Sequence, residues 1–397
     1  MAHRSVAEHR AALRHVVGRG GAERLALDRH AVGRRLAGDL FAADDLPRFD
    51  SSAMDGYAVH PARADQRVLD VVGDVAAGAA AEFEVGPGKA ARIMTGARVP
   101  TGSLAVVAVE RTDAAPTGPV PGKVTIDGDV LTGQHIRRRG EDLARGDVIA
   151  PAGSLVDPAL LALARSAGCT AVTVHALTRI AVVATGAELA APGQVPGAGE
   201  IHESNSEMIA ALAEAADCVV TRVETCTDDP DELLGLLHAL DAAPDVDLVV
   251  TTGGVSQGAH EVVRQVGEAI GGFEFVHLTM QPGGPQGTGH LRSTPVVCLP
   301  GTPVGAYVSF TMLLRPALEE RHGAPAREGV VVTYAGPERR VRPGRVQFVS
   351  AVLASDGTVS VAPGVHLPAL SAANAFIEVP AEVEQLRGGD LVVVRPI

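Results

Sequence analysis

The sequence predicts a multidomain α/β protein that combines a doubly wound parallel sheet with two mainly-β modules. The chain has 397 residues, too many for a single core, because one domain commonly holds about 100–200 residues. Apolar strand-like runs alternate with helical patterns from Arg179 to about Arg321, which is typical of a parallel sheet covered by helices. Short strand-like runs separated by Gly and Pro occupy residues 56–139 and the chain after Gly323, and they predict small all-β modules.

The remaining segments predict helices. Apolar residues recur at helical spacing from Ser5 to Gly18, which indicates a first helix. We expect a second helical stretch near Asp28–Ala42, ahead of an irregular segment rich in Pro, Asp and Ser. A further helix is expected to begin at Pro158, because proline is favoured in the first helical turn and Asp157 is a suitable N-cap.

The α/β part is expected to alternate strand and helix along its whole length. Its predicted strands are RIAVVATG, CVVTRVETC, DLVVTTGG and TPVVCLPG. Its predicted helices are SNSEMIAALAEAA, DPDELLGLLHALDAA, HEVVRQVGEAI and PVGAYVSFTMLLRPALEE. Strands of this apolar character are expected to lie between two layers of helices.

Composition argues against several classes of protein. Lys+Arg 34 and Asp+Glu 47 give a net charge of −13, which is unfavourable for binding nucleic-acid phosphates. No window approaches the ~20 apolar residues of a membrane span, and the N-terminus lacks the apolar stretch of a signal peptide. The four cysteines contain no CxxC pair, so neither a zinc site nor a disulfide framework is expected. We therefore expect a soluble, cytoplasmic protein that binds neither nucleic acid nor membrane.

The end of the DLVVTTGG strand predicts an anion-binding turn. The chain turns on Gly253 and Gly254 and then passes Ser256 toward a helix. At the carboxyl end of a parallel strand, such a turn directs backbone N–H groups toward a ligand. A plain strand–helix turn that needs glycine is the alternative.

A second strand end, at Thr185 and Gly186, places Glu188 just beyond it. Because both strand ends are expected at one edge of the sheet, Glu188 could hold a divalent cation against a bound phosphate. A solvated loop glutamate is the alternative. Further acidic candidates for this edge are Glu203, Asp228, Asp229 and Glu261. The run Asp228-Asp229-Pro230 could instead be a helix N-cap, and Glu261 could stabilise the helix dipole.

Several motifs occur together in the order seen in one family. They are FDSSAMDGYAV, ARIMTGARVP, RRRGEDLARGDVIAPAG, ATGAEL, IHESNS, TTGGVSQG, MQPGGPQGTG and LPGTPV. On these motifs the chain resembles the molybdopterin molybdenumtransferases of the MoeA type, a family that includes the gephyrin E domain. The resemblance covers nearly the whole chain.

The resemblance implies an elongated protomer of four domains that forms a homodimer. The implied domains are a doubly wound molybdopterin-binding domain (1–23 plus 177–322), a small α+β connecting domain (24–44 plus 140–176), an inserted mainly-β domain (45–139) and a C-terminal β domain (323–397). A molybdopterin adenylyltransferase is suggested as a further partner.

The resemblance also implies a reaction and a set of site residues. Molybdenum from molybdate is inserted into adenylated molybdopterin with Mg²⁺ and release of AMP, the last step of molybdenum cofactor biosynthesis. The implied catalytic residues are Glu188, Asp228, Glu261 and Asp142, with Glu188 and Asp228 as metal ligands. The implied ligand-binding residues are Asp55, Thr95, Thr185, Gly186, Glu203, Gly253, Gly254, Ser256, Pro282, Pro300, Gly301 and Ser371.

Several positions depart from the family pattern, among them Thr302 in LPGTP, where the family has asparagine, and Val365-His366, where it has a Gly-Ser segment. Lysine is common in the family where this chain has Gly284 and Gln281, and an acidic residue is usual at Ala259. Loss of a lysine removes a fixed cation that would hold an oxyanion, although Arg264 or Arg292 could substitute. These departures leave open an alternative, a catalytically impaired paralogue that binds molybdopterin or a protein partner without transferring metal.

Overall fold

The computed structural model describes residues 2–79, 81–190, 193–258 and 261–397. The chain divides into two compact units, one made of residues 1–23 with 175–397 and the other of residues 24–174. A division into two units does not test the boundaries predicted within each unit, so the four domains stay a prediction.

The first unit is built around a seven-stranded sheet with the order β1-β18-β20-β21-β17-β13-β16. Strands β13, β16, β17 and β21 run parallel, as expected, whereas β20 is antiparallel to both its neighbours. The expectation of a wholly parallel sheet is wrong there, because the links on either side of β20 are too short for the crossover of a dozen or more residues that a parallel pair requires. The bounds are β1 (Ala2–Arg4), β13 (Arg179–Thr185), β16 (Val219–Cys226), β17 (Leu248–Thr252), β18 (Glu274–Leu278), β20 (Pro285–His290) and β21 (Pro295–Leu299).

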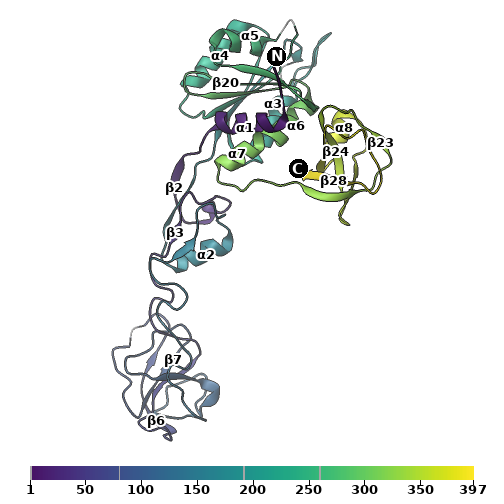
Figure 1. The fold of residues 1–397 in the computed structure, drawn as a ribbon. Coiled ribbons are helices and arrows are strands. Elements are labelled where there is room, and N and C mark those ends of the chain that lie inside the picture. Colours follow the sequence, from purple (N-terminus) through teal and green to yellow (C-terminus); the bar gives the residue numbers. More distant parts are fainter. Residues whose placement is uncertain (1, 80, 191–192, 259–260) are drawn as a thin grey trace. The chain divides into compact units, whose positions relative to one another are not determined.

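Helices cover both faces of this sheet (Figure 1). Successive residues of a strand point to opposite faces: Val182 packs with α1, α3, α6 and α7 on one face, and Val183 packs with α4 and α5 on the other. The doubly wound arrangement is therefore confirmed. The helical bounds are α1 (Val6–Val17), α3 (Asn205–Glu214), α4 (Pro230–Ala242), α5 (Val262–Ile270), α6 (Pro303–Ser309) and α7 (Arg315–Arg321), with a π-helical segment η3 (Phe310–Leu314) joining the last two.

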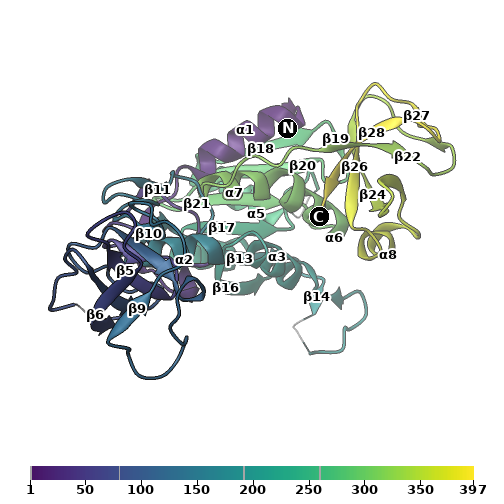
Figure 2. The ribbon, with the colours of Figure 1, turned by 90° about the horizontal axis from the view of Figure 1, so that it is seen from below.

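The C-terminal part of this unit is a small barrel with one helix beside it (Figure 2). Strands β24, β25, β22, β28 and β26 are paired in that order, and β26 also pairs with β24, which closes the ring. A short strand of the α/β part, β19 (Met280–Gln281), extends β24 in parallel. The bounds are β22 (Val330–Tyr334), β24 (Val346–Leu353), β25 (Thr358–Val361), α8 (His366–Ser371), β26 (Ala375–Val379) and β28 (Leu391–Pro396).

The second unit contains the expected all-β module, a five-stranded sheet with the order β8-β5-β7-β6-β9. Its core is made of small and β-branched residues around the buried Tyr57. The sheet bounds are β5 (Gly56–His60), β6 (Val68–Val75), β7 (Lys89–Ile93), β8 (Ala105–Ala108) and β9 (Lys123–Thr125). The strands outside this sheet, between residues 22 and 175, are β2 (Ala22–Ala26), β3 (Leu40–Phe41), β4 (Ser51–Ser52), β10 (Ile136–Arg137), β11 (Val148–Ala150) and β12 (Ala171–His175).

Of the two further helices predicted here, one is confirmed and one is wrong. Helix α2 (Pro158–Ser166) begins as expected, with the Asp157 carboxylate accepting a hydrogen bond from the N–H of Leu160. The stretch 28–42 is no α-helix: it forms a single 3₁₀ turn and then extended backbone. Gly33, with φ at 90°, takes the left-handed conformation that interrupts a helix.

No helix among the described residues combines the length and the apolar character needed to cross a membrane.

Candidate active site

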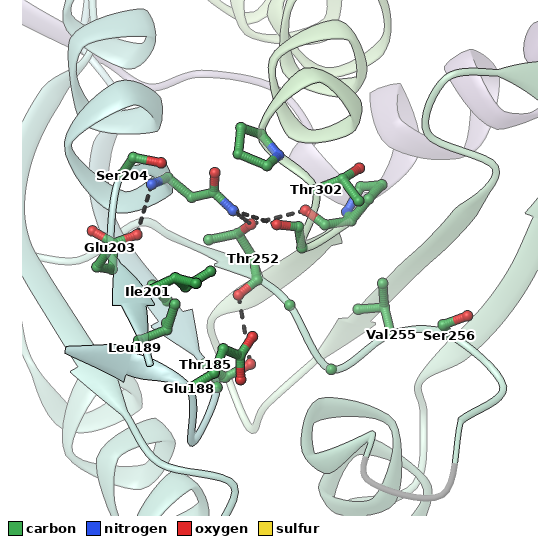
Figure 3. A pocket seen from close by; sticks show the side chains of 18 of the residues that line it. Thr185, Glu188, Leu189, Ile201, Glu203, Ser204, Thr252, Val255, Ser256 and Thr302 are labelled. Carbon is green, nitrogen blue, oxygen red and sulfur yellow. Dashed lines mark hydrogen bonds between the residues drawn. The ribbon is translucent and has the colours of Figure 1, made fainter. Parts of the chain in front are cut away.

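A cavity of about 610 Å³ lies at the carboxyl edge of the seven-stranded sheet. Parallel register brings the strand ends level, because Ala184 of β13 pairs with Thr252 of β17, and Thr252 pairs with Leu299 of β21. Figure 3 shows Thr185, Glu188 and Thr252 grouped at these ends. The predicted site residues that line the cavity are Thr185, Gly186, Glu188, Glu203, Asp228, Gly253, Gly254, Ser256, Glu261, Pro300 and Gly301.

The turn after β17 depends on its two glycines. Gly253 and Gly254 have φ values of 99° and 62°, in the region that favours glycine. A Cβ on Gly253 would lie 2.4 Å from the carbonyl oxygen of Thr185, so a side chain there would push two strand ends apart. The backbone N–H groups of Gly254 and Val255 have no hydrogen-bond partner among the described residues. The turn therefore offers two free donors beside the cavity.

Glu261 holds the far side of this turn. Its carboxylate accepts hydrogen bonds from the N–H of Ser256 (2.7 Å) and of Gly258 (3.2 Å). It precedes α5 without accepting a capping bond from that helix. Its observed contacts are thus to the loop, and the helix-dipole alternative does not account for them.

Two other carboxylates lie at the neighbouring strand ends. Asp228 accepts a hydrogen bond from the N–H of Ala187 (3.1 Å), whereas Asp229 is the N-cap of α4. The N-cap expected in the run Asp228-Asp229-Pro230 is therefore confirmed, with Asp229 as the capping residue, and Asp228 does not have that role. Glu188 lies against Gly186, where a Cβ would be 2.7 Å from its Oε2. The Glu188 carboxylate and Asp228 Oδ1 accept no hydrogen bond from the described residues.

Glu203 lines the cavity but is already engaged. Its Oε1 accepts hydrogen bonds from the N–H of Asn205 (2.6 Å) and of Ser206 (2.9 Å), and its Oε2 accepts one from the Ser206 hydroxyl (2.6 Å). These contacts hold the first turn of α3. A structural role therefore accounts for the observed contacts of this carboxylate.

Asn205, the first residue of α3, links this helix to the end of β17 and to the loop after β21, and the sequence analysis did not select it. Its Nδ2 donates to Thr252 Oγ1 (3.1 Å) and to the carbonyl of Gly301 (2.7 Å), while Thr252 Oγ1 donates to the carbonyl of Pro300 (2.9 Å). Its Oδ1 is buried and has no partner among the described residues. The only sequence signal for Asn205 is its place in the IHESNS motif, from which the sequence analysis selects Glu203 instead.

The charge of the cavity is negative. Among its described lining residues it carries four carboxylates and neither lysine nor arginine. An anionic ligand would be repelled there unless a cation accompanied it. No group of three His, Cys, Asp or Glu side chains suited to a metal ion occurs in the described part of the chain. Mg²⁺ commonly uses only one or two carboxylates, together with water and substrate phosphates.

Two predicted residues of the first unit do not line the cavity. Pro282 directly follows β19, and Ser371 is the last residue of α8 beside the barrel. Gly283, the residue after Pro282, does line the cavity.

Three predicted residues belong to the second unit. Asp55 accepts hydrogen bonds from the N–H (2.6 Å) and the hydroxyl (2.8 Å) of Thr95, and these bonds lower the pKa of the Asp55 carboxyl. Asp142 forms an ion pair with Arg137. These contacts are all within the second unit.

Two stretches of the chain match two family models. Residues 4–168 match the "MoeA N-terminal region (domain I and II)", and residues 181–320 match the "probable molybdopterin binding domain". The chain is 40% identical over 385 residues to molybdopterin molybdenumtransferase 2 of Mycobacterium tuberculosis, covering 90% of this chain and 91% of that protein. The chain belongs to the MoeA family.

Other members agree. Molybdopterin molybdenumtransferase 1 of Mycobacterium tuberculosis is 32% identical over 403 residues, with 92% of each protein covered. The crystal structure of a molybdopterin biosynthesis MoeA protein from Pyrococcus horikoshii superposes with a TM-score of 0.84 at 26% identity, covering 98% of both chains.

Of the departures from the MoeA pattern, Thr302 lines the cavity, and Gly284 lies between two residues that line it, Gly283 and Pro285. A Cβ on Gly284 would lie 2.7 Å from Nε2 of His277, so this histidine occupies the space that a lysine would use. Gln281 ends β19, and its Oε1 is buried without a hydrogen-bond partner among the described residues. Ala259 lies outside the described residues.

Of the two arginines considered as substitutes for a lost lysine, only one lies near the turn. Arg264 on α5 donates to Glu268 (2.8 Å) and lies 3.5 Å from the carbonyl oxygen of Ser256. Arg292 precedes β21, whereas the cavity lies beyond the carboxyl end of that strand. Strand direction thus excludes Arg292 from this edge.

Proposed function

We propose that this protein transfers molybdenum from molybdate to adenylated molybdopterin and releases AMP, forming molybdenum cofactor. The single observation that carries the proposal is the cavity at the carboxyl edge, where carboxylates and free backbone donors converge, in a chain of the MoeA family. A phosphoanhydride needs both neutralising charge and oriented N–H donors during its cleavage.

Glu188 and Asp228 are proposed to hold Mg²⁺. Their donor chemistry fits the ion, because carboxylate oxygens are hard ligands and both side chains keep oxygens that are not engaged by the described residues. When bound, Mg²⁺ would neutralise charge on the phosphoanhydride oxygens.

The turn after β17 is proposed to bind the pyrophosphate. The N–H groups of Gly254 and Val255 are the free donors, and Glu261 keeps the turn open by binding Ser256 and Gly258. Backbone donors in such a turn favour anions. Thr185, Gly186, Pro300 and Gly301 are proposed to line the same ligand.

Other contributions rest on the resemblance to the family and stay predictions. They comprise the homodimer, the molybdopterin adenylyltransferase partner and the cytoplasmic location. They also comprise substrate contacts from Pro282 and Ser371, contacts from Asp55 and Thr95 across the dimer, and a catalytic role for Asp142.

Reconstitution tests the proposal. Purified protein is given adenylated molybdopterin, molybdate and Mg²⁺, and AMP release and cofactor formation are followed together. We expect both products to appear in parallel. The impaired-paralogue alternative requires substrate binding without AMP release, and that result would reject the transferase proposal.

A further inference from the structure

A second cavity, of about 420 Å³, lies where α1, the segment from η3 to α7 and strand β28 meet. It shares no residue with the candidate active site. Guanidinium groups dominate its polar wall, contributed by Arg10, Arg14, Arg315, Arg327 and Arg395.

Arg10 is a partly buried cation with an incomplete set of hydrogen-bond partners. Its side chain is only 19% exposed, and its Nε donates to the carbonyl of Met312 (2.9 Å). The contact of its Nη1 with Glu378 is 3.8 Å long, which exceeds a hydrogen bond. Glu378 instead accepts a hydrogen bond from Arg395. The Nη donors of Arg10 therefore have no hydrogen-bond partner among the described residues.

The other carboxylates of the wall do not supply the missing anion. Arg315 and Arg327 both contact the same oxygen of Glu319 at 2.8 Å, and Glu320 is paired with Arg14 (2.6 Å). Even with Glu328 and Glu378 included, the five guanidiniums exceed the four carboxylates around the cavity. The wall keeps a positive excess in a protein whose net charge is −13.

An independent observation comes from Thr311, which also lines this cavity. Its side chain is buried, and its hydroxyl has no hydrogen-bond partner among the described residues. Thr311 lies in the π-helical segment η3, next to the residue whose carbonyl binds Arg10. Single π-helical turns occur frequently at functional sites.

We propose that this cavity binds a small dianion of the phosphate class, held by Arg10 and Thr311. A planar guanidinium matches the oxygens of a phosphate and forms charge-assisted hydrogen bonds with them. The cavity exceeds the size of a lone phosphate and has apolar walls at Met312 and Val330, so a phosphomonoester with a short organic group suits it better than the inorganic ion. The proposal does not rest on the proposed function.

Calorimetric titration of the full chain with inorganic phosphate tests the proposal, with EDTA present so that no divalent cation supports binding at the active site. We expect saturable binding of one phosphate per chain, and tighter binding of glycerol phosphate. Arg10→Gln should weaken phosphate binding at least tenfold, and Thr311→Val several-fold. Arg222→Gln, on β16 where Arg222 pairs with Asp245, is the matched control and should bind as the wild type does.

Two results would overturn the proposal: no saturable phosphate binding by the wild type, or equal binding by the wild type and Arg10→Gln. Far-UV circular dichroism monitors folding. If Arg10→Gln fails to fold, phosphate binding is measured instead with Arg10→Lys and Thr311→Val. Arg10→Lys keeps the positive charge but lacks the planar guanidinium.

Discussion

Glu261 binds the backbone N–H of Ser256 at 2.7 Å, across the turn that follows β17. The same carboxylate also binds Gly258, so one side chain sets the shape of the loop beside the free N–H groups. The sequence predicted that Glu261 belongs to the site. It did not indicate that this carboxylate stabilises the loop by hydrogen bonds to its backbone.

Glu261→Ala should therefore weaken catalysis through the loop. Loss of two hydrogen bonds to a charged group, each worth about 1.5–3 kcal/mol, lets the turn relax and should reduce kcat/KM for AMP release by at least tenfold. Glu261→Gln keeps one acceptor oxygen, so its kcat/KM for AMP release should fall by less than that of Glu261→Ala. Glu214→Gln, at the exposed end of α3, is the control; equal activities for Glu261→Ala and this control would contradict the loop role.

Glu188→Gln should reduce AMP release by on the order of 100-fold, because it removes a charged ligand proposed for Mg²⁺. Its unfolding temperature should stay at the wild-type value, since the carboxylate accepts no hydrogen bond from the described residues. Rates measured against Mg²⁺ concentration check this prediction. A variant with wild-type rate and wild-type Mg²⁺ dependence would remove Glu188 from the metal site.

Gly253→Ala should lower the free energy of unfolding by about 2 kcal/mol or more. A Cβ would lie 2.4 Å from the Thr185 carbonyl at a φ of 99°, and the left-handed conformation alone costs about 1–2 kcal/mol. Gly235→Ala in α4 is the matched control: no atom lies within 4 Å of its Cβ, so it should stabilise by about 0.5–1 kcal/mol. Urea unfolding measures the free energy of unfolding of both variants. An unchanged free energy of unfolding for Gly253→Ala would contradict the close approach of residue 253 to the Thr185 carbonyl.

Gly284→Lys should not restore a family lysine by itself, because the new Cβ would meet His277 at 2.7 Å. The double variant Gly284→Lys with His277→Ala provides the space. We expect the double variant to reach half-maximal cofactor formation at a lower molybdate concentration than His277→Ala alone. An unchanged molybdate dependence would show that residue 284 does not face the oxyanion.

His9 should make the first unit sensitive to acid. It is fully buried in α1, neither ring nitrogen has a partner among the described residues, and burial lowers its pKa to about 4. Because the unfolded chain binds the proton near pH 6.5 and the folded chain does not, stability falls as pH drops from 6.5 toward 4. The loss should approach about 3 kcal/mol.

The measurement is the difference between wild type and His9→Leu in urea unfolding at pH 7 and pH 4.5, which cancels the titration of shared carboxylates. The wild type should lose more stability than His9→Leu over this interval. Parallel losses would show that His9 takes up its proton in the folded state.

Much of the fold follows from local pattern. The helix at Pro158 was predictable because Asp157 and Pro158 specify a helix start within four residues. The stretch 28–42 was not, because its apolar spacing imitates a helix while bridges such as Leu36 to Val174, distant in sequence, hold it extended. Strand β20 likewise took its antiparallel direction from the shortness of its links rather than from its composition.

The order of motifs along the chain was enough to identify the family. The carboxylates of the site could be selected from the sequence because the carboxyl ends of parallel strands lie at one edge of a sheet. What each carboxylate does was decided by the folded chain alone. Asp229, not Asp228, caps α4. Glu203 accepts hydrogen bonds from the first turn of α3. Asn205 donates a hydrogen bond to Gly301, nearly a hundred residues later in the sequence. Periodicity reports which face of an element is buried, whereas hydrogen-bond partners depend on distances that arise only when separate segments pack together.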